Sequence, residues 1–216
     1  MSGPNPPSPA RAEDGRRLRG RRSRVRIRAA ARELFRERGF DGATLRAIAE
    51  RAGMGTSSIY RHVRTKQELL ILELADLQEE AWTRFRLGDD RSVPTLRRVH
   101  RFFEMQHELL ASDADLTVIA LRATTYPDAP VSRRVLALQD RTIGLLAEIL
   151  QAGRQRDLAA DVDVLAAARA LFHITTGARL SWANGLASES ACRRSIATSV
   201  ELLFRGLSAS NSERDP

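Results

Sequence analysis

The chain has 216 residues, of which 43% are hydrophobic and 29% are charged, and its formal net charge is +8. This composition is typical of a globular protein and excludes a fibrous or disordered chain, and no apolar run reaches the roughly 18 residues that a membrane span needs. Cys192 is the only cysteine, so neither an intrachain disulfide nor a cysteine-based zinc site is available.

Positive charge is concentrated in the first third of the chain. Residues 1–66 contain 17 basic and 6 acidic residues, a net charge of +11, whereas residues 67–216 contain 18 basic and 21 acidic residues, a net charge of −3. Arginine-rich segments bind polyanions because they neutralise phosphates and release counterions, so we predict that this third faces a polyanion. A coding bias toward arginine is the alternative, but it leaves unexplained why acidic residues balance the charge only after residue 66.

The first 22 residues have the composition of an arm rather than of a folded segment. "MSGPNPPSPA" is rich in proline and serine, and "RRLRGRRSR" is a basic run interrupted by Gly20. We predict a disordered basic arm over residues 1–22 that reaches along a DNA backbone or into a minor groove; a solubilising tail is the alternative. No apolar core of a signal peptide is present, so we expect a cytoplasmic protein without a membrane partner.

A helical pattern begins at Val25. Apolar residues then recur at three- and four-residue intervals up to Gly39, which is placed to end the first helix. Thr44 is placed to cap a second helix that Gly53 ends, and a short third helix fits about residues 56–63. Thr65 and Glu68 have the spacing of a capping box for a fourth helix. The expected inner faces of the first two helices are Ile27, Ala30, Ala31, Leu34 and Phe35, then Leu45, Ile48, Ala49 and Ala52.

The second and third helices have the proportions of a helix-turn-helix. The connecting "GMG" permits the sharp turn that lets the third helix cross the second and project from the surface. Ile59 and Val63 would anchor the inner face of that third helix. Its short hydroxyl side chains permit close approach to base edges and phosphates, and they belong to Thr56, Ser57 and Ser58.

These segments resemble the DNA-binding head of the TetR family of transcriptional regulators. The resemblance rests on "IRAAARELFRERGFDGAT" followed by "TLRAIAERAGMGTSSIYRHVRTKQELL" and covers about residues 25–70. It implies DNA contacts from Thr44 and Arg46, and phosphate contacts from Tyr60, His62 and Lys66. The residues implied to face bases or the adjacent backbone are Thr56, Ser57, Ser58 and Arg61.

Three positions depart from the family pattern. Gly55 stands where a capping serine is common, Ser57 replaces a common glycine, and Val63 replaces the usual phenylalanine. None of them removes a phosphate-binding group. The departures therefore bear on base preference rather than on DNA binding.

The remainder of the chain shows helical patterns and no strand alternation, so the predicted fold class is all-α, with a three-helix head and a larger C-terminal helical domain. The predicted organisation is the arm over residues 1–22, the DNA-binding domain over 23–70, a ligand-binding and dimerisation domain over 71–208, and a flexible tail over 209–216. The resemblance implies that the last two helices form a four-helix bundle with a partner chain. Gly177 and Ala178 would permit close packing there; the alternative is that Gly177 relieves crowding inside one subunit.

A ligand pocket between these helices would be mostly apolar with a few polar groups. Each candidate lining residue is equally consistent with an ordinary core position. The candidates are Trp82, Phe85, Phe103, Met105, Tyr126, Thr142, Phe172 and Thr176. His100, Glu104 and His107 share one helical face and are metal-ligand types, but a solvated face explains them as well, and we predict no metal site or cofactor.

Two classes of function remain from the sequence. The first is a DNA-binding transcriptional regulator, a repressor by the resemblance, that binds a palindromic operator as a homodimer and is released by a small-molecule effector. The second is a small helical enzyme or carrier with an incidental basic tail. No nucleophile elbow, zinc-protease motif or phosphate-binding loop is present, so we expect no enzyme.

Overall fold

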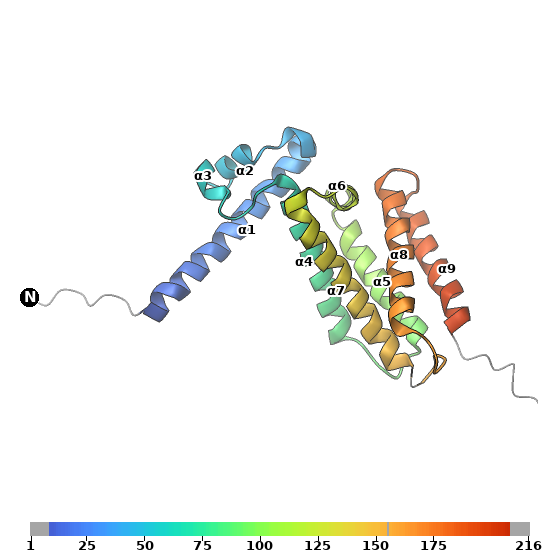
Figure 1. The fold of residues 1–216 in the computed structure, drawn as a ribbon. Helices are drawn as coiled ribbons and strands as arrows, with labels where there is room; N and C mark the ends of the chain where they lie inside the picture. Colours follow the sequence, from blue (N-terminus) through green and yellow to red (C-terminus); the bar gives the residue numbers. More distant parts are fainter. Residues whose placement is uncertain (1–8, 155, 208–216) are drawn as a thin grey trace, which may run out of the picture. The chain divides into compact units, whose positions relative to one another are not determined.

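The computed structural model describes residues 9–154 and 156–207. Over these residues the chain forms nine helices and no strand, which confirms the all-α prediction (Figure 1). The helices are α1 (Pro9–Gly42), α2 (Leu45–Arg51), α3 (Thr56–Ile59), α4 (Lys66–Leu87), α5 (Thr95–Ala111), α6 (Ala114–Thr125), α7 (Ala129–Gly153), α8 (Val164–Ala183) and α9 (Glu189–Leu207). None of these described helices combines the length and apolar character needed to cross a membrane.

The chain divides into two compact units. The first ends at Leu69 and contains α1 to α3 with the start of α4, and the second begins at Leu70 and contains the rest.

Helix α1 is longer than the sequence predicts. It begins at Pro9, so residues 9–22, which were expected in a disordered arm, are helical. Alanine and arginine are good helix formers, proline is tolerated in a first turn, and an internal glycine such as Gly20 costs only about 1 kcal/mol. Residues 1–8 of the expected arm and 209–216 of the expected tail lie outside the described residues.

The core of the first unit follows the predicted pattern. The five expected inner residues of α1, from Ile27 to Phe35, are each at most 4% exposed, and Ile48 and Ala49 of α2 are fully buried. Gly39 has φ +69°, a left-handed conformation that ends the regular part of α1. The bounds of α1 run on to Gly42 across that kink.

The predicted cap at Thr44 and the predicted turn glycine Gly53 are confirmed. The Thr44 hydroxyl accepts a hydrogen bond of 3.1 Å from the Ala47 backbone N–H and caps α2. Gly53 has φ +63°, which explains the glycine in the turn, whereas Gly55 has φ −65° and no conformational need for glycine.

Helix α3 is shorter than the predicted 56–63, because it ends at Ile59 and continues as a turn. The turn is still tied back to α3 by the 3.0 Å hydrogen bond from the Val63 N–H to the Ile59 carbonyl. Tyr60, His62 and Val63 have modest helix propensity, and the cap at Thr65 leaves little room for another turn. Ile59 and Val63 nevertheless fill the buried anchor positions at 0% and 4% exposure.

The second unit is built around the packing of α5, α7, α8 and α9. Helix α8 contacts α6, α7 and α9, and α5 contacts α7 and α9 (Figure 1). An aromatic cluster links α4 to α5, with ring centroids 5.5–6.1 Å apart, and consists of Trp82, Phe85, Phe102 and Phe103.

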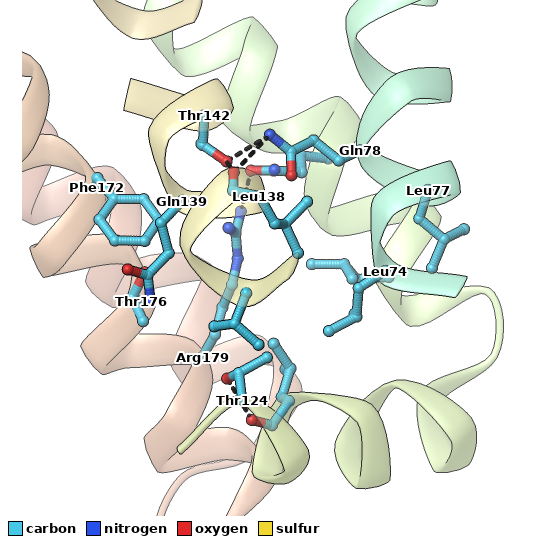
Figure 2. A pocket seen from close by; sticks show the side chains of 14 residues that line it. Leu74, Leu77, Gln78, Thr124, Leu138, Gln139, Thr142, Phe172, Thr176 and Arg179 are labelled. Atoms are coloured by element: carbon cyan, nitrogen blue, oxygen red, sulfur yellow. Dashed lines mark hydrogen bonds between the residues drawn. The ribbon is translucent and has the colours of Figure 1, made fainter. Parts of the chain in front are cut away.

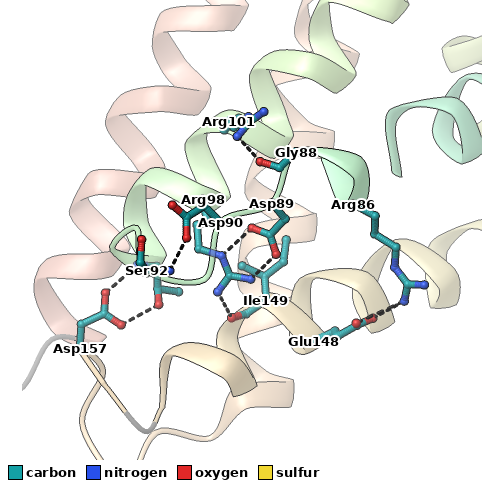
Figure 3. A network of polar contacts seen from close by, with 11 residues as sticks. Arg86, Gly88, Asp89, Asp90, Ser92, Arg98, Arg101, Glu148, Ile149 and Asp157 are labelled. Carbon is teal, nitrogen blue, oxygen red and sulfur yellow. Dashed lines mark hydrogen bonds and ion pairs between the residues drawn. The ribbon is translucent and has the colours of Figure 1, made fainter. Parts of the chain in front are cut away.

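A polar network fixes the α4–α5 connection against α7 (Figure 3). The buried Arg98 guanidinium binds the Asp89 carboxylate through two hydrogen bonds of 2.7 and 2.8 Å and also reaches the Ile149 carbonyl at 3.5 Å. Asp157, beyond α7, accepts hydrogen bonds of 2.6 Å from both the N–H and the hydroxyl of Thr95 and so caps α5. This cap comes from 62 residues away in the sequence.

Candidate functional site

The helix-turn-helix presents a polar surface in the first unit. Thr44, Arg46, Thr56, Ser57 and Tyr60 are exposed, the last by 56%. Arg61 is exposed as well, whereas Ser58, His62 and Lys66 are half-buried. Of the nine predicted DNA-contacting residues, six are thus exposed and three are half-buried, and Lys66 is the one whose surroundings differ from those expected.

Two arginines of this surface are engaged in exposed interactions. Arg61 donates a hydrogen bond of 2.5 Å to the Ser58 hydroxyl, and Arg46 forms an ion pair of 3.1 Å with Glu50. Exposed pairs of this kind contribute at most about 1 kcal/mol because water screens them. Both guanidinium groups are therefore available to a phosphate or base edge at little cost.

Arg51 has a structural role, because it links α2 to α1. It forms ion pairs of 3.1 Å with Glu33 and 2.8 Å with Glu37, both on α1. The hydrogen bond from Arg51 lowers the pKa of Glu37. These contacts hold α2 against α1. Because the two carboxylates neutralise the charge of Arg51, the positive potential of the surface comes from the other arginines.

Lys66 is tied to the end of α1. Its Nζ donates hydrogen bonds of 2.6 Å to the Phe40 carbonyl and 3.3 Å to the Asp41 carbonyl, and it lies 4.4 Å from the centroid of the Phe40 ring. The ammonium thus satisfies carbonyl groups where α1 ends. Sequence reasoning missed this role because nothing in the local pattern places Phe40 beside Lys66; a phosphate contact by Lys66 stays a prediction.

His62 is poised as a neutral group. Partial burial lowers its pKa, and the positive charges of Arg24 and Arg61 lower it further. A neutral imidazole can still donate one hydrogen bond to a phosphate. Its contribution to binding DNA would then be a hydrogen bond rather than a charge.

The second unit contains an apolar pocket lined by α4 to α8 (Figure 2). Its cavity volume is about 90 Å³, and part of it is open to solvent. Small-molecule sites typically have volumes of roughly 300–1,000 Å³, so a ligand of ordinary size would require the lining side chains to move apart. The lining residues are Leu74, Leu77, Gln78, Gln106, Leu110, Leu121, Thr124, Val135, Leu138, Gln139, Thr142, Phe172, Thr176 and Arg179.

A few polar groups interrupt the apolar wall. The Gln78 amide donates to the Thr142 hydroxyl, and Thr142 in turn donates to the Leu138 carbonyl at 2.9 Å (Figure 2). Arg179 donates a hydrogen bond of 2.7 Å to the Gln106 side-chain oxygen. An apolar wall with a small number of fixed polar groups is the usual composition of a ligand site.

Three of the eight predicted pocket residues, Thr142, Phe172 and Thr176, line this pocket. Trp82 and Phe85 line a separate, polar hollow beside Arg86 and Asp89. The other three do not line the apolar pocket: Phe103 faces a small hollow beside His107, Tyr126 is 87% exposed, and Met105 is half-buried.

The polar lining residues Gln78, Gln106 and Arg179 were missed by sequence reasoning. For Arg179 a signal was present, because Phe172, Thr176 and Arg179 are spaced four and three residues apart and so share one face of α8. The pattern could not show that this face lines a cavity.

The predicted face of His100, Glu104 and His107 pairs with α9. The His107 Nε2 atom lies 3.1 Å from the Glu189 carboxylate, and the His100 Nε2 atom lies 4.0 Å from that of Glu201. Within the part of the chain that the structure describes, no three His, Cys, Asp or Glu side chains gather as metal ligands would. Burial lowers the pKa of His107, and its hydrogen bond to Glu189 partly opposes that shift.

Comparison with known proteins places the first unit in context. Residues 27–72 match the family model described as bacterial regulatory proteins, tetR family. The chain is 26% identical over 181 residues to the HTH-type transcriptional repressor KstR of Rhodococcus jostii, an alignment that covers 84% of this chain and 82% of that protein.

Two solved structures share the fold. The Thermus thermophilus FadR repressor in complex with lauroyl-CoA has a TM-score of 0.68 and 24% identity, with 89% of this chain and 99% of that chain covered. The Bacillus subtilis regulator FadR in complex with stearoyl-CoA has a TM-score of 0.65 and 19% identity, with 85% and 98% covered.

Proposed function

The chain belongs to the TetR family of transcriptional regulators, and from that premise we propose that it is a repressor that binds a palindromic operator as a homodimer and leaves it when a small molecule occupies the pocket of the second unit. The observation that carries the proposal is the exposed turn of Thr56 to Arg61, set in the arginine-rich unit above the buried anchors Ile59 and Val63. Small hydroxyl side chains beside an exposed guanidinium suit contact with base edges.

A palindromic operator follows from two-fold symmetry. In a homodimer the segment Thr56 to Arg61 of each copy, here called the recognition turn, would enter a major groove. The two half-sites would then be centred about 34–36 Å apart, one helical turn of DNA. The net charge of +11 over residues 1–66 supports a large phosphate-dependent share of the affinity.

Helices α8 and α9 are the proposed dimer surface. Leu165 of α8 and Leu202 of α9 are 48% and 58% exposed, and Gly177 is exposed with no atom within 4 Å of where a Cβ would lie. That open space supports packing of Gly177 against a partner chain over relief of crowding inside one subunit. Sedimentation of the Leu202→Glu variant should show monomer where the unchanged chain shows dimer; an equally exposed control, Leu136→Glu on α7, should stay dimeric.

Release by an effector is proposed to act through α4. Lys66, its first residue, contacts the end of α1, while Leu74, Leu77 and Gln78 of the same helix line the pocket. A ligand that fits only one arrangement of α4 would favour that arrangement and shift the chain away from its DNA-binding state. The acyl-CoA complexes of the two FadR structures support an effector with a long apolar part.

The proposed function is tested by binding to the DNA beside the protein's own gene and to random DNA of the same length over a salt series. We expect tighter binding to the former at every salt concentration, with both affinities falling as salt rises. Equal affinities for the two DNAs would contradict the proposal and show that the protein binds DNA without sequence specificity.

A screen for small molecules that raise the melting temperature tests the effector half of the proposal. We expect that at least one stabilising compound that binds in the pocket also releases the protein from the operator. Stabilising compounds that all leave the operator complex intact would contradict it.

A further inference from the structure

Arg179 is a buried cation in the wall of the apolar pocket. Its side chain is 7% exposed and extends from α8 toward the centre of the lined region (Figure 2). Within the described residues its guanidinium makes one hydrogen bond, of 2.7 Å, to the Gln106 side-chain oxygen, and it lies 5.9 Å from the Phe103 ring centroid. The Arg179 Nε–H is fully buried and has no hydrogen-bond partner among the described residues.

The charge of Arg179 also lacks a counter-ion. Across residues 9–154 and 156–207, no carboxylate lies within ion-pair distance of it, whereas Arg98, equally buried in the same unit, is held by Asp89 at 2.7 Å. Glu189, the acidic residue on the α9 side, is 3.1 Å from the His107 Nε2 atom instead. Burial of an unpaired charge is strongly disfavoured. An anion that bound beside Arg179 would offset much of the free-energy cost of burying that charge.

Arg179 stays charged at neutral pH despite its surroundings. Burial lowers its pKa to about 10, and the neighbouring Cys192 opposes that shift. His107, which also lies near Arg179, has a pKa lowered by burial and adds no competing positive charge at neutral pH. The pocket therefore contains one persistent positive charge at its polar end.

We propose that the pocket binds a small amphipathic monoanion, a carboxylate on an apolar body, and that Arg179 and Gln106 are the residues that bind its head group. The apolar body would lie among Leu74, Leu77, Leu110 and Val135, and the carboxylate would accept from the Arg179 guanidinium and from the Gln106 amide. One guanidinium matches one negative charge. This inference rests on the proposed function in taking the pocket as the effector site.

The probes are straight-chain carboxylates of six to fourteen carbons, the matching primary alcohols, and lauroyl-CoA, each titrated calorimetrically into the full-length chain. We expect the best carboxylate to bind roughly ten- to hundred-fold more tightly than the alcohol of the same length, as a hydrogen-bonded charge pair implies. Lauroyl-CoA, with several phosphate charges, should bind more weakly than the free carboxylate. Absence of binding by every carboxylate, or equal affinity of carboxylate and alcohol, overturns the proposal, as does tighter binding of lauroyl-CoA that survives Arg179→Met.

Arg179→Met removes the charged guanidinium while keeping an apolar side chain in place of the aliphatic part of arginine. It should lose the carboxylate preference and bind the alcohol at least as well, whereas Arg133→Met, an exposed change on α7, should bind both as the unchanged chain does. Retained carboxylate preference in Arg179→Met overturns the proposal. If Arg179→Met fails to fold, the carboxylate-to-alcohol comparison on the unchanged chain decides alone.

Release of the operator DNA by each compound is measured separately from binding of the compound. Carboxylate binding through Arg179 without release would support this site and contradict the effector mechanism. Release by an uncharged compound, undiminished in Arg179→Met, would support the mechanism and contradict this site.

Discussion

Individual side chains of the first unit divide into those that hold the unit together and those left free for DNA. Arg51 and Lys66 are bound to α1, through two carboxylates and two carbonyls respectively. Arg46 and Arg61 are exposed and weakly engaged. The family pattern alone does not separate these two groups, because it says which residues recur and not what each one contacts in the folded chain.

Replacing Lys66 by methionine should reduce stability as well as DNA binding. The Phe40 and Asp41 carbonyls would lose a charged donor, and we expect the free energy of unfolding in urea to fall by about 1–3 kcal/mol. Arg64→Met, an exposed neighbour, should change it by no more than about 0.5 kcal/mol. Unchanged stability of Lys66→Met would show that its contact with the end of α1 does not matter.

Replacing Arg61 by alanine should relax sequence preference. A guanidinium that reads a base edge contributes about 1–3 kcal/mol to the operator complex and less to random DNA, so the ratio of the two affinities should fall. Arg38→Ala removes an exposed arginine of α1 and should leave that ratio unchanged. If Arg61→Ala weakens both complexes equally in fluorescence anisotropy, Arg61 contacts phosphate and not bases.

His107 should make stability depend on pH near neutrality. Burial lowers its pKa in the folded chain, so folding favours the neutral ring and this stability is fully present above the unfolded value of about 6.5. It is lost as the pH falls from there through the folded pKa. His107→Gln should show a smaller fall in melting temperature between pH 7 and pH 5, while His173→Gln, exposed on α8, should follow the unchanged chain. Identical pH profiles for all three chains would contradict this assignment.

At the scale of the helices, capping and turn residues predicted where a helix begins or ends, but they did not predict how far α1 extends. Thr44, Gly39 and Gly53 act through their own backbone or the next turn, so their roles could be predicted from the sequence. The continuation of α1 to Pro9 could not be predicted in this way, because a basic run next to a proline-rich segment has the composition of an arm. The cap of α5 by Asp157 depends on a contact that only the packed fold creates.

Replacing Asp157 by alanine tests that remote cap. The buried Thr95 would lose the acceptor for both its N–H and its hydroxyl, and a lost cap typically costs about 1–2 kcal/mol. Asp161→Ala removes an exposed carboxylate from the same connection and should have little effect on chemical denaturation. Equal stability of the two variants would show that the Thr95 contact contributes nothing.

At the scale of the whole molecule, the fold class and the polar surface of the first unit could be predicted because each rests on a strong local pattern. The pocket could be predicted only in part. The aromatic residues Trp82, Phe85 and Phe103 pack against each other or Phe102, and the cavity lies instead where residues of five helices meet. Helical periodicity gives the face of each helix but not which faces leave space between them.

The central claim is that two copies of the recognition turn read one palindromic site. Hydroxyl-radical footprinting on the DNA beside the protein's own gene tests it most directly. We expect a two-fold symmetric footprint whose strongest protections are centred about one helical turn apart, and which the Arg61→Ala variant weakens on both halves. A single asymmetric footprint, or protection spread evenly along the DNA, would contradict it.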